Sequence, residues 1–186
     1  MNFSELFDDV PIVAAVKSET ELDECLMSDS NVVFLLFGDI CSVPSLVKRI
    51  KDGGKIAIVH IDLIEGLAPR EVGVEYIKYH TNADGIISTK EALIRYANEL
   101  GLLSIRRFFL LDSLALDAVF KHAQSSYADA FEVLPGVMPK IISYISEECE
   151  KPIIAGGLIR DKEDVLAALT AGAIAVSSTN SKVWFM

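Results

Sequence analysis

The chain has 186 residues, of which 51% are hydrophobic and 24% charged, so it can bury one globular core. Its formal net charge of −10 repels phosphates and anionic lipids at long range. This argues against broad, non-specific binding of nucleic acid, and any RNA contact has to use a local basic patch. The longest apolar run, Val32 to Phe37, is far too short to span a bilayer.

The cysteines and the first residues predict a cytoplasmic protein. The three cysteines, Cys25, Cys41 and Cys149, have spacings that fit no zinc or redox motif, and we interpret them as reduced thiols. The first nine residues are acidic and short of apolar side chains, unlike a signal peptide. No metal or other cofactor is expected from these patterns.

Eight short apolar runs alternate with amphipathic stretches along the whole chain. The runs are apolar almost throughout, which is typical of strands buried on both faces of a parallel sheet. They are Pro11–Val16, Asn31–Phe37, Lys55–Ile61, Asp84–Ile87, Arg106–Leu111, Asp129–Leu134, Pro152–Ala155 and Ala173–Ser177.

Eight β/α units in series favour a closed barrel over an open doubly wound sheet, which typically has about five or six strands. The sequence therefore predicts a single α/β domain over residues 1–186, a compact (β/α)₈ TIM-type barrel. Only nine residues follow Ser177, so we expect the last helix to be truncated or missing and Trp184 to fill the gap. Ser18 with Glu21, and Ser88 with Glu91, have capping-box spacing and predict helix starts.

Small residues at the ends of the last two runs predict a phosphate site. In such barrels phosphate is commonly bound after strands seven and eight. Gly156 and Gly157 let backbone amides approach an anion closely, and Ser177 and Ser178 supply hydroxyls before a short helix. The alternative is that the glycine pair only makes a tight turn.

Polar residues at other strand ends predict a cup for a hydroxylated ligand. They are Lys17, Asp39, His60, Asp62 and Glu132. The two-residue period places His60 and Asp62 on one face, and Glu132 lies between apolar neighbours, where a carboxylate must be bonded to something. Each residue alone also has a structural explanation, such as an ion pair between Lys17 and a carboxylate.

No catalytic motif is present. The chain has no G-x-S-x-G, no H-E-x-x-H and no Cys/His pairing, and His60 with Asp62 provides too few ligands for a metal site. We therefore expect a protein that is not an enzyme. One alternative is a barrel lyase, isomerase or hydrolase acting on a small phosphate ester, with His60, Asp62 or Glu132 as acid or base. Another is a structural barrel that has lost its ligand.

Several segments, taken together and in order, resemble one family. They are His60–Leu67 (HIDLIEGL), Asp84–Lys90 (DGIISTK), Phe109–Ser113 (FLLDS), Glu132–Pro139 (EVLPGVMP) and Pro152–Ile159 (PIIAGGLI). They are similar to the glycerol-3-phosphate-responsive antiterminators, which regulate bacterial glycerol uptake operons. The resemblance implies a cytoplasmic transcription regulator that binds glycerol 3-phosphate and then the leader mRNA of glycerol-utilisation genes, preventing premature termination. It implies no membrane partner and leaves a homo-oligomer open.

The candidate RNA contacts are clustered cations. Lys48, Arg49 and Lys51 lie on the second predicted helix, and Arg106 and Arg107 are further candidates. The alternative is a solvated helix face. The second helix leads away from the ligand end of the barrel, so ligand control would have to reach it through altered packing or oligomerisation.

Overall fold

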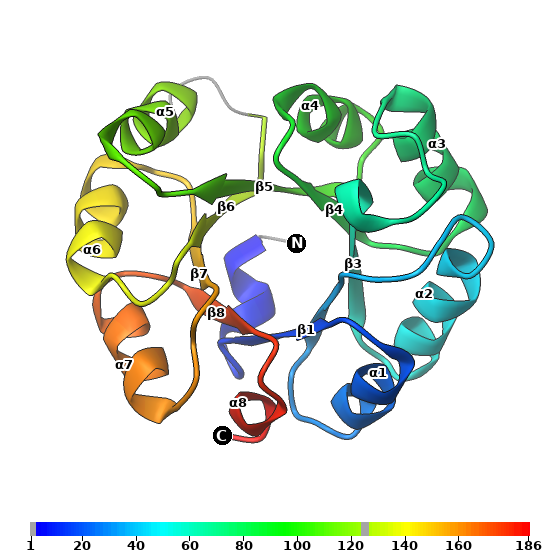
Figure 1. Ribbon diagram of the computed structural model, residues 1–186, viewed down its shortest axis with the longest axis horizontal. Helices are drawn as coiled ribbons and strands as arrows, with labels where there is room; N and C mark the ends of the chain where they lie inside the picture. The colour runs from blue at the N-terminus through cyan, green and yellow to red at the C-terminus, as the bar shows by residue number, and fades with distance from the viewer. Residues whose placement is uncertain (1–2, 124–126) are drawn as a thin grey trace.

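A computed structural model describes residues 3–123 and 127–186; Met1 and Asn2 of the acidic N-terminal segment, and residues 124–126, lie outside the described part. Eight parallel strands form a closed barrel in sequence order, with β8 paired to β1, and the helices surround it (Figure 1). The predicted (β/α)₈ barrel is therefore confirmed.

The strands are β1 Ile12–Val16, β2 Val32–Leu35, β3 Ile56–His60, β4 Gly85–Ser88, β5 Leu103–Phe109, β6 Ala130–Leu134, β7 Ile153–Gly156 and β8 Ala175–Ser178. The helices are α1 Glu19–Leu26, α2 Val43–Asp52, α3 Glu71–His80, α4 Glu91–Glu99, α5 Ser113–Ala123, α6 Pro139–Glu148, α7 Lys162–Thr170 and α8 Ser181–Trp184, with 3₁₀ turns η1 Phe3–Phe7 and η2 Ile61–Leu63.

The strand boundaries agree with the predicted runs within two residues, except at β5. This strand begins at Leu103 and not at Arg106. Ser104 interrupts the apolar run, yet it is buried, and its hydroxyl donates to Asp129 at 2.9 Å. A hydroxyl with a hydrogen-bond partner is tolerated inside a strand. Reading Ser104 as a break therefore placed the predicted start of β5 too late.

The apolar core has two layers that follow the alternation of side chains along each strand. Residues such as Ile58, Ile105 and Ala130 form the cluster inside the barrel, and their strand neighbours pack under the helices. The turn η1, which the sequence did not predict, adds Phe3 and Phe7 to the inner cluster. Since η1 leads into β1, it closes the end at which the strands begin. The opposite end, at which the strands finish, is not covered by η1 and is available for a ligand site.

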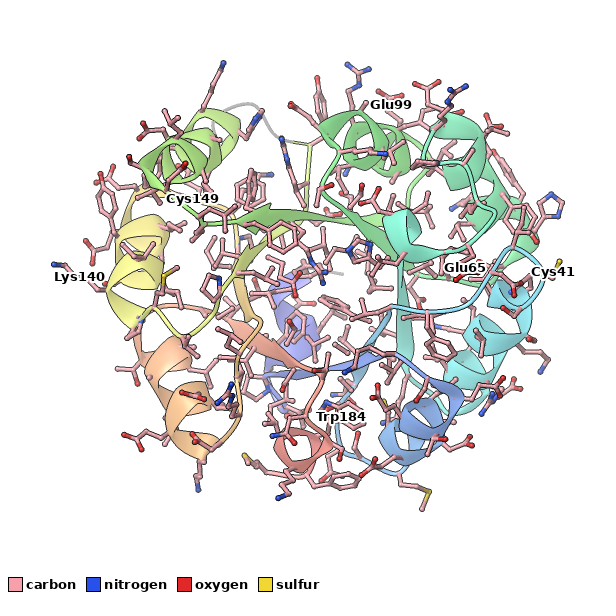
Figure 2. All side chains as sticks on the ribbon, viewed as in Figure 1. Cys41, Glu65, Glu99, Lys140, Cys149 and Trp184 are labelled. Carbon is pink, nitrogen blue, oxygen red and sulfur yellow. The ribbon has the colours of Figure 1, made fainter. Side chains whose placement is uncertain are left out.

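The last helix is short, as expected. α8 has four residues, and Trp184 is buried, with its Nε1 donating to the carbonyl of Ser178 at 2.8 Å. Figure 2 shows Trp184 on the barrel side of α8. The indole fills the space that a longer helix would cover, which confirms the prediction.

Of the two predicted helix starts, the N-cap at Ser18 is confirmed and the one at Ser88 is wrong. The Ser18 hydroxyl accepts from the amide of Glu21 at 3.2 Å, where α1 begins. Ser88 instead ends β4, and its hydroxyl donates to Asp62 at 2.9 Å. The same hydroxyl accepts from the amide of Lys90 at 3.0 Å, and α4 begins only at Glu91, so Ser88 lies too early to be its N-cap.

The three thiols are unpaired. Cys25 and Cys149 are buried and Cys41 is exposed. Burial raises the pKa of Cys25 to about 11, so this thiol is a poor nucleophile at neutral pH. Within residues 3–123 and 127–186, no helix combines the length and the apolar character needed to cross a membrane.

Candidate functional site

A cavity of about 480 Å³ opens where the strands finish, between β5, β6 and the loops that follow β7 and β8. Its lining includes Arg107, Glu132, Gly157, Ser177 and Ser178. The volume lies in the range of small-molecule sites, roughly 300–1,000 Å³. The position is the one at which barrels of this type carry their ligands.

Three polar side chains from three strands form the floor of this cavity. Arg107, Glu132 and Ser177 each follow an inward-facing apolar residue by two positions, so they point into the barrel. Glu132 is fully buried. Its Oε1 accepts from the Ser177 hydroxyl at 2.5 Å, and its Oε2 accepts from Nε of Arg107. The expectation that Glu132 must be bonded is therefore confirmed, although the sequence did not name the partners.

The two glycines after β7 have different roles. A Cβ on Gly156 would lie 2.5 Å from Oε1 of Glu132 and 2.6 Å from Oγ of Ser177, so this glycine leaves room for the floor. Gly157 has φ +75°, and the next residue, Leu158, has φ +64°. A left-handed, 58% exposed leucine is an outlier that side-chain burial does not explain. Such outliers concentrate at functional loops.

The loops after β7 and β8 are tied together into one wall. The Ser178 hydroxyl donates to the carbonyl of Ile159 at 2.8 Å and accepts from the amide of Asn180 at 3.0 Å. Nδ2 of Asn180 donates to the carbonyl of Arg160 at 2.8 Å. Gly157, Ser177 and Ser178 line one cavity, and Gly156 lies against Glu132 and Ser177 of its floor.

Arg160 is a site residue that the sequence analysis missed. It lines the cavity, it is exposed, and its guanidinium forms no ion pair within the described part of the chain. By contrast, Arg107, the other cation of the lining, is bonded to Glu132. Its place in the sequence could have indicated this role, because Arg160 follows the glycine pair by only three residues.

His60 and Asp62 lie near this floor but do not line the cavity. His60 points inward beyond Ile58 and is buried, and its Nδ1 has no hydrogen-bond partner in residues 3–123 and 127–186. Asp62 lies in η2, where strand alternation has ended, and its Oδ2 accepts from the Ser88 hydroxyl at 2.9 Å and from the Thr89 amide at 3.0 Å. The distance from Nδ1 of His60 to Oδ2 of Asp62 is 4.0 Å.

Burial of His60 predicts a pH-dependent stability. Desolvation, followed by the charge of Arg107, lowers the pKa of His60 to about 4. The unfolded chain therefore binds this proton first as the pH falls below about 6.5, so the stability is present above that pH and is lost toward pH 4. Between pH 7 and pH 5 we expect His60 to contribute about 2 kcal/mol to the fall in unfolding free energy. Urea unfolding at both pH values should show a fall that is smaller by this amount in His60→Gln; an equal fall in parent and variant contradicts the assignment.

Lys17 and Asp39 do not line the cavity, and as ligand contacts they stay predictions. The Lys17 side chain is 54% exposed and lies 3.8 Å from the carboxylate of Glu21. The Asp39 carboxylate accepts from the amides of Cys41 and Ser42 at 2.7 and 2.8 Å, in the turn before α2. The hydrogen bonds from the amides of Ser42 and Cys41 lower the pKa of Asp39. Both residues therefore have partners in the turns where they lie.

Comparison with known proteins identifies the family. The family profile described as "Glycerol-3-phosphate responsive antiterminator" matches residues 12–184. The chain belongs to this family. The sequence resemblance is therefore confirmed, and membership indicates a regulator rather than an enzyme.

Relatives of this antiterminator share most of its length. The chain is 41% identical, over 94% of its length and 91% of the relative's, to a protein of Escherichia coli K12 with the name "Uncharacterized protein YgcP". It is 31% identical to a glycerol uptake operon antiterminator regulatory protein of Listeria monocytogenes, with 96% of each chain covered and a TM-score of 0.91. A glycerol uptake operon antiterminator-related protein of Thermotoga maritima, also 31% identical, superposes over 94% of this chain and 98% of its own with a TM-score of 0.82.

More distant structures show the fold alone. A deoxyribose phosphate aldolase from Aeropyrum pernix superposes with a TM-score of 0.68 at 16% identity, covering 94% of this chain and 87% of its own. The antiterminator therefore has the barrel shared with such enzymes.

The basic residues on α2 of the antiterminator are compensated by neighbouring carboxylates. Lys48 lies 2.6 Å from Asp52, and Lys51 lies 2.6 Å from Asp84. Arg49 is bonded to two carboxylates of α1, those of Glu19 and Asp23, at 3.0 and 2.5 Å. The sequence suggested free positive charge on this helix, and the structure pairs each cation.

Arg106 and Arg107 offer little surface to RNA, because their side chains are only 9% and 10% exposed. Arg106 lies under α4 with NH1 3.2 Å from the carboxylate of Glu91, and its guanidinium covers the ring of Phe108. Arg107 points into the barrel toward Glu132. Alternation along β5 separates the two arginines onto opposite faces, and neither face is the outer surface.

Proposed function

We propose that this antiterminator senses glycerol 3-phosphate in the cavity at the ends of β7 and β8, and that the loaded protein binds the leader mRNA of glycerol-utilisation genes to prevent premature termination. Such a regulator would act in the cytoplasm. The observation that carries the proposal is the cavity itself, which combines a left-handed glycine turn with an arginine that forms no ion pair among the described residues, in a chain of this family.

The phosphate end of the ligand fits the wall formed by the loops after β7 and β8. The left-handed turn at Gly157 and Leu158 brings backbone to the cavity, and Ser177 and Ser178 end the neighbouring strand. The net charge of the chain repels a phosphate dianion. Arg160 supplies a local positive charge that attracts it.

The glycerol end fits the floor. Glu132 accepts hydrogen bonds and Arg107 donates them, so two vicinal hydroxyls can pair with one group each. We also propose His60 and Asp62 for this end. His60 lies close enough to Arg107 for the arginine charge to lower its pKa. The proposed contacts are therefore Gly156, Gly157, Ser177, Ser178 and Arg160 for phosphate, with Glu132, Arg107, His60 and Asp62 at the glycerol end.

We also propose that the ligand is bound without turnover. Lysine, which forms the Schiff bases of many aldolases, is missing among the described residues that line the cavity, and so is histidine. Glu132 is held between Arg107 and Ser177, which suits recognition of a hydroxyl better than transfer of a proton.

Replacing Arg160 tests the phosphate assignment. We expect Arg160→Gln to weaken glycerol 3-phosphate binding roughly tenfold to a hundredfold, since a hydrogen bond to a charged group contributes about 1.5–3 kcal/mol. Glycerol should bind equally weakly to parent and variant. Calorimetric titration measures both affinities. Arg70→Gln is the matched control, because Arg70 is exposed, lies outside the cavity and gives the same change in charge.

The same titration decides between the regulator and an enzyme. Binding of glycerol 3-phosphate without product, together with ligand-dependent binding of a leader transcript, supports the proposal. Product formation on the timescale of binding would contradict it, and so would equal affinities of Arg160→Gln and parent.

A further inference from the structure

Three exposed lysines contrast with the paired cations of α2. Lys140, Lys162 and Lys182 lie in the first turns of α6, α7 and α8, and within the described part of the chain none forms an ion pair. Figure 2 shows Lys140 directed away from the barrel. In a chain with net charge −10, lysines without carboxylate partners mark the surface where the potential favours an anion.

These lysines belong to one continuous surface, which we call the rim patch. Helices in a βα barrel begin at the end where the strands finish, so all three lysines lie at the ligand end. Lys140 and Lys162 line the same groove between α6 and α7. The hydrogen bond from Asn180 to the carbonyl of Arg160 joins the segments that lead to Lys182 and Lys162.

The groove between the two lysines is apolar and open. It has a volume of about 800 Å³, and its lining includes Pro139, Leu166 and Ala167, with Leu166 half exposed. Glu163 also lines it, so the lining itself holds two lysines and one carboxylate. The nearby Asp161 and Asp164 accept from amides at the start of α7. The amino ends of α6 and α7 add positive potential to that of the lysines.

We infer that the rim patch is the surface that contacts RNA, with Lys140, Lys162 and Lys182 on successive phosphates of a single strand and an unstacked base over the groove. This rests on the proposed RNA-binding function. Single-stranded RNA combines a polyanionic backbone with apolar base faces, and the patch offers a partner for each.

The rim patch also shortens the route from ligand to RNA. The loops after β7 and β8 form the wall of the ligand cavity and continue directly into the helix starts that carry Lys162 and Lys182. The ligand and the RNA would therefore contact opposite sides of the same loops. Coupling needs no signal through the barrel to α2.

Two triple variants with the same change in charge test the location. In the first, Lys140, Lys162 and Lys182 become glutamine, and in the second, Lys48, Arg49 and Lys51 do. Anisotropy with labelled polyuridylate and with a leader transcript of glycerol-uptake genes, at saturating glycerol 3-phosphate, gives the RNA affinity. Loss of three contacts should weaken polyuridylate binding by the rim variant about fiftyfold at roughly 0.15 M salt and flatten the log–log salt slope by about 2. The α2 variant should bind RNA like the parent, and both variants should stay folded and keep their ligand affinity.

The outcomes separate this inference from the function on which it rests. If the rim variant binds both RNAs like the parent, the inference is overturned while the antiterminator function stands, and the groove is then a site for a protein partner. If only the α2 variant loses affinity, the inference is equally overturned. If the parent binds neither RNA even at low salt, RNA binding fails as a function and the rim patch fails with it.

Discussion

Gly157→Asp is expected to abolish binding of glycerol 3-phosphate while the barrel still folds. Gly157 lies in the loop that lines the cavity, so a carboxylate added there would meet the phosphate dianion at short range. Two unit charges about 4 Å apart repel by roughly 4 kcal/mol at an effective dielectric constant near 20, which corresponds to about a thousandfold loss of affinity. Calorimetric titration of the folded variant measures this loss.

Gly157→Asn separates charge from shape in this prediction. Gly157 has φ +75°, and a Cβ there would lie 3.1 Å from Cδ2 of Leu134, so any side chain brings some strain. Asparagine and aspartate tolerate left-handed backbone better than other residues and have nearly the same size. The asparagine variant should therefore lose far less affinity. Equal losses in the two variants would show that shape and not charge blocks the site, and unchanged affinity in the aspartate variant would move the phosphate elsewhere.

The barrel could be predicted because each of its signals is local. A strand buried on both faces has to be largely apolar, and the eight runs were apolar almost throughout; β1, β2, β7 and β8 are buried at every position. The glycine pair after β7 and the serines at the end of β8 were found for a similar reason, since the barrel topology brings adjacent strand ends together.

The partners within the site could not be predicted, because they come from residues far apart in the chain. Arg107 has a register partner in Glu132, 25 residues later, and its neighbour Arg106 faces the helices. Without the register of β5 against β6, two adjacent arginines resemble a surface patch. Ser88 shows the same limit, since its hydroxyl donates to Asp62 in η2, 26 residues earlier in the chain.

Charge compensation was likewise hidden from the sequence. The cations of α2 lie within four positions of the chain, yet Arg49 is paired with carboxylates of α1 and Lys51 with Asp84. The lysines of the rim patch are scattered through the chain, and the barrel gathers them at one end. The cations that cluster in the sequence, on α2, are therefore not the cations that lie unpaired together in the described part of the folded chain, on the rim patch.

The pairing of Arg107 with Glu132 predicts a large and non-additive effect on stability. Arg107→Met removes one partner of a buried pair and leaves the fully buried Glu132 with Ser177 alone, which should lower the unfolding free energy by about 3–5 kcal/mol. Replacing both partners, Arg107→Met with Glu132→Leu, should restore most of that loss, because apolar groups of similar volume need no compensation. Urea unfolding of the parent, both single variants and the double variant measures the coupling between the two residues.

The exposed pair of Lys48 and Asp52 is the matched control for that cycle. Its side chains are 66% and 62% exposed, and surface pairs contribute at most about 1 kcal/mol, so the same cycle there should be nearly additive. A double variant at Arg107 and Glu132 that loses the sum of its single losses would show that the two residues stabilise the barrel independently. In that case the floor is not one charge-paired unit, and each residue would have to meet the ligand on its own. A strong coupling instead means that a ligand hydroxyl at either residue acts on both, so removing either one should also weaken binding of glycerol 3-phosphate.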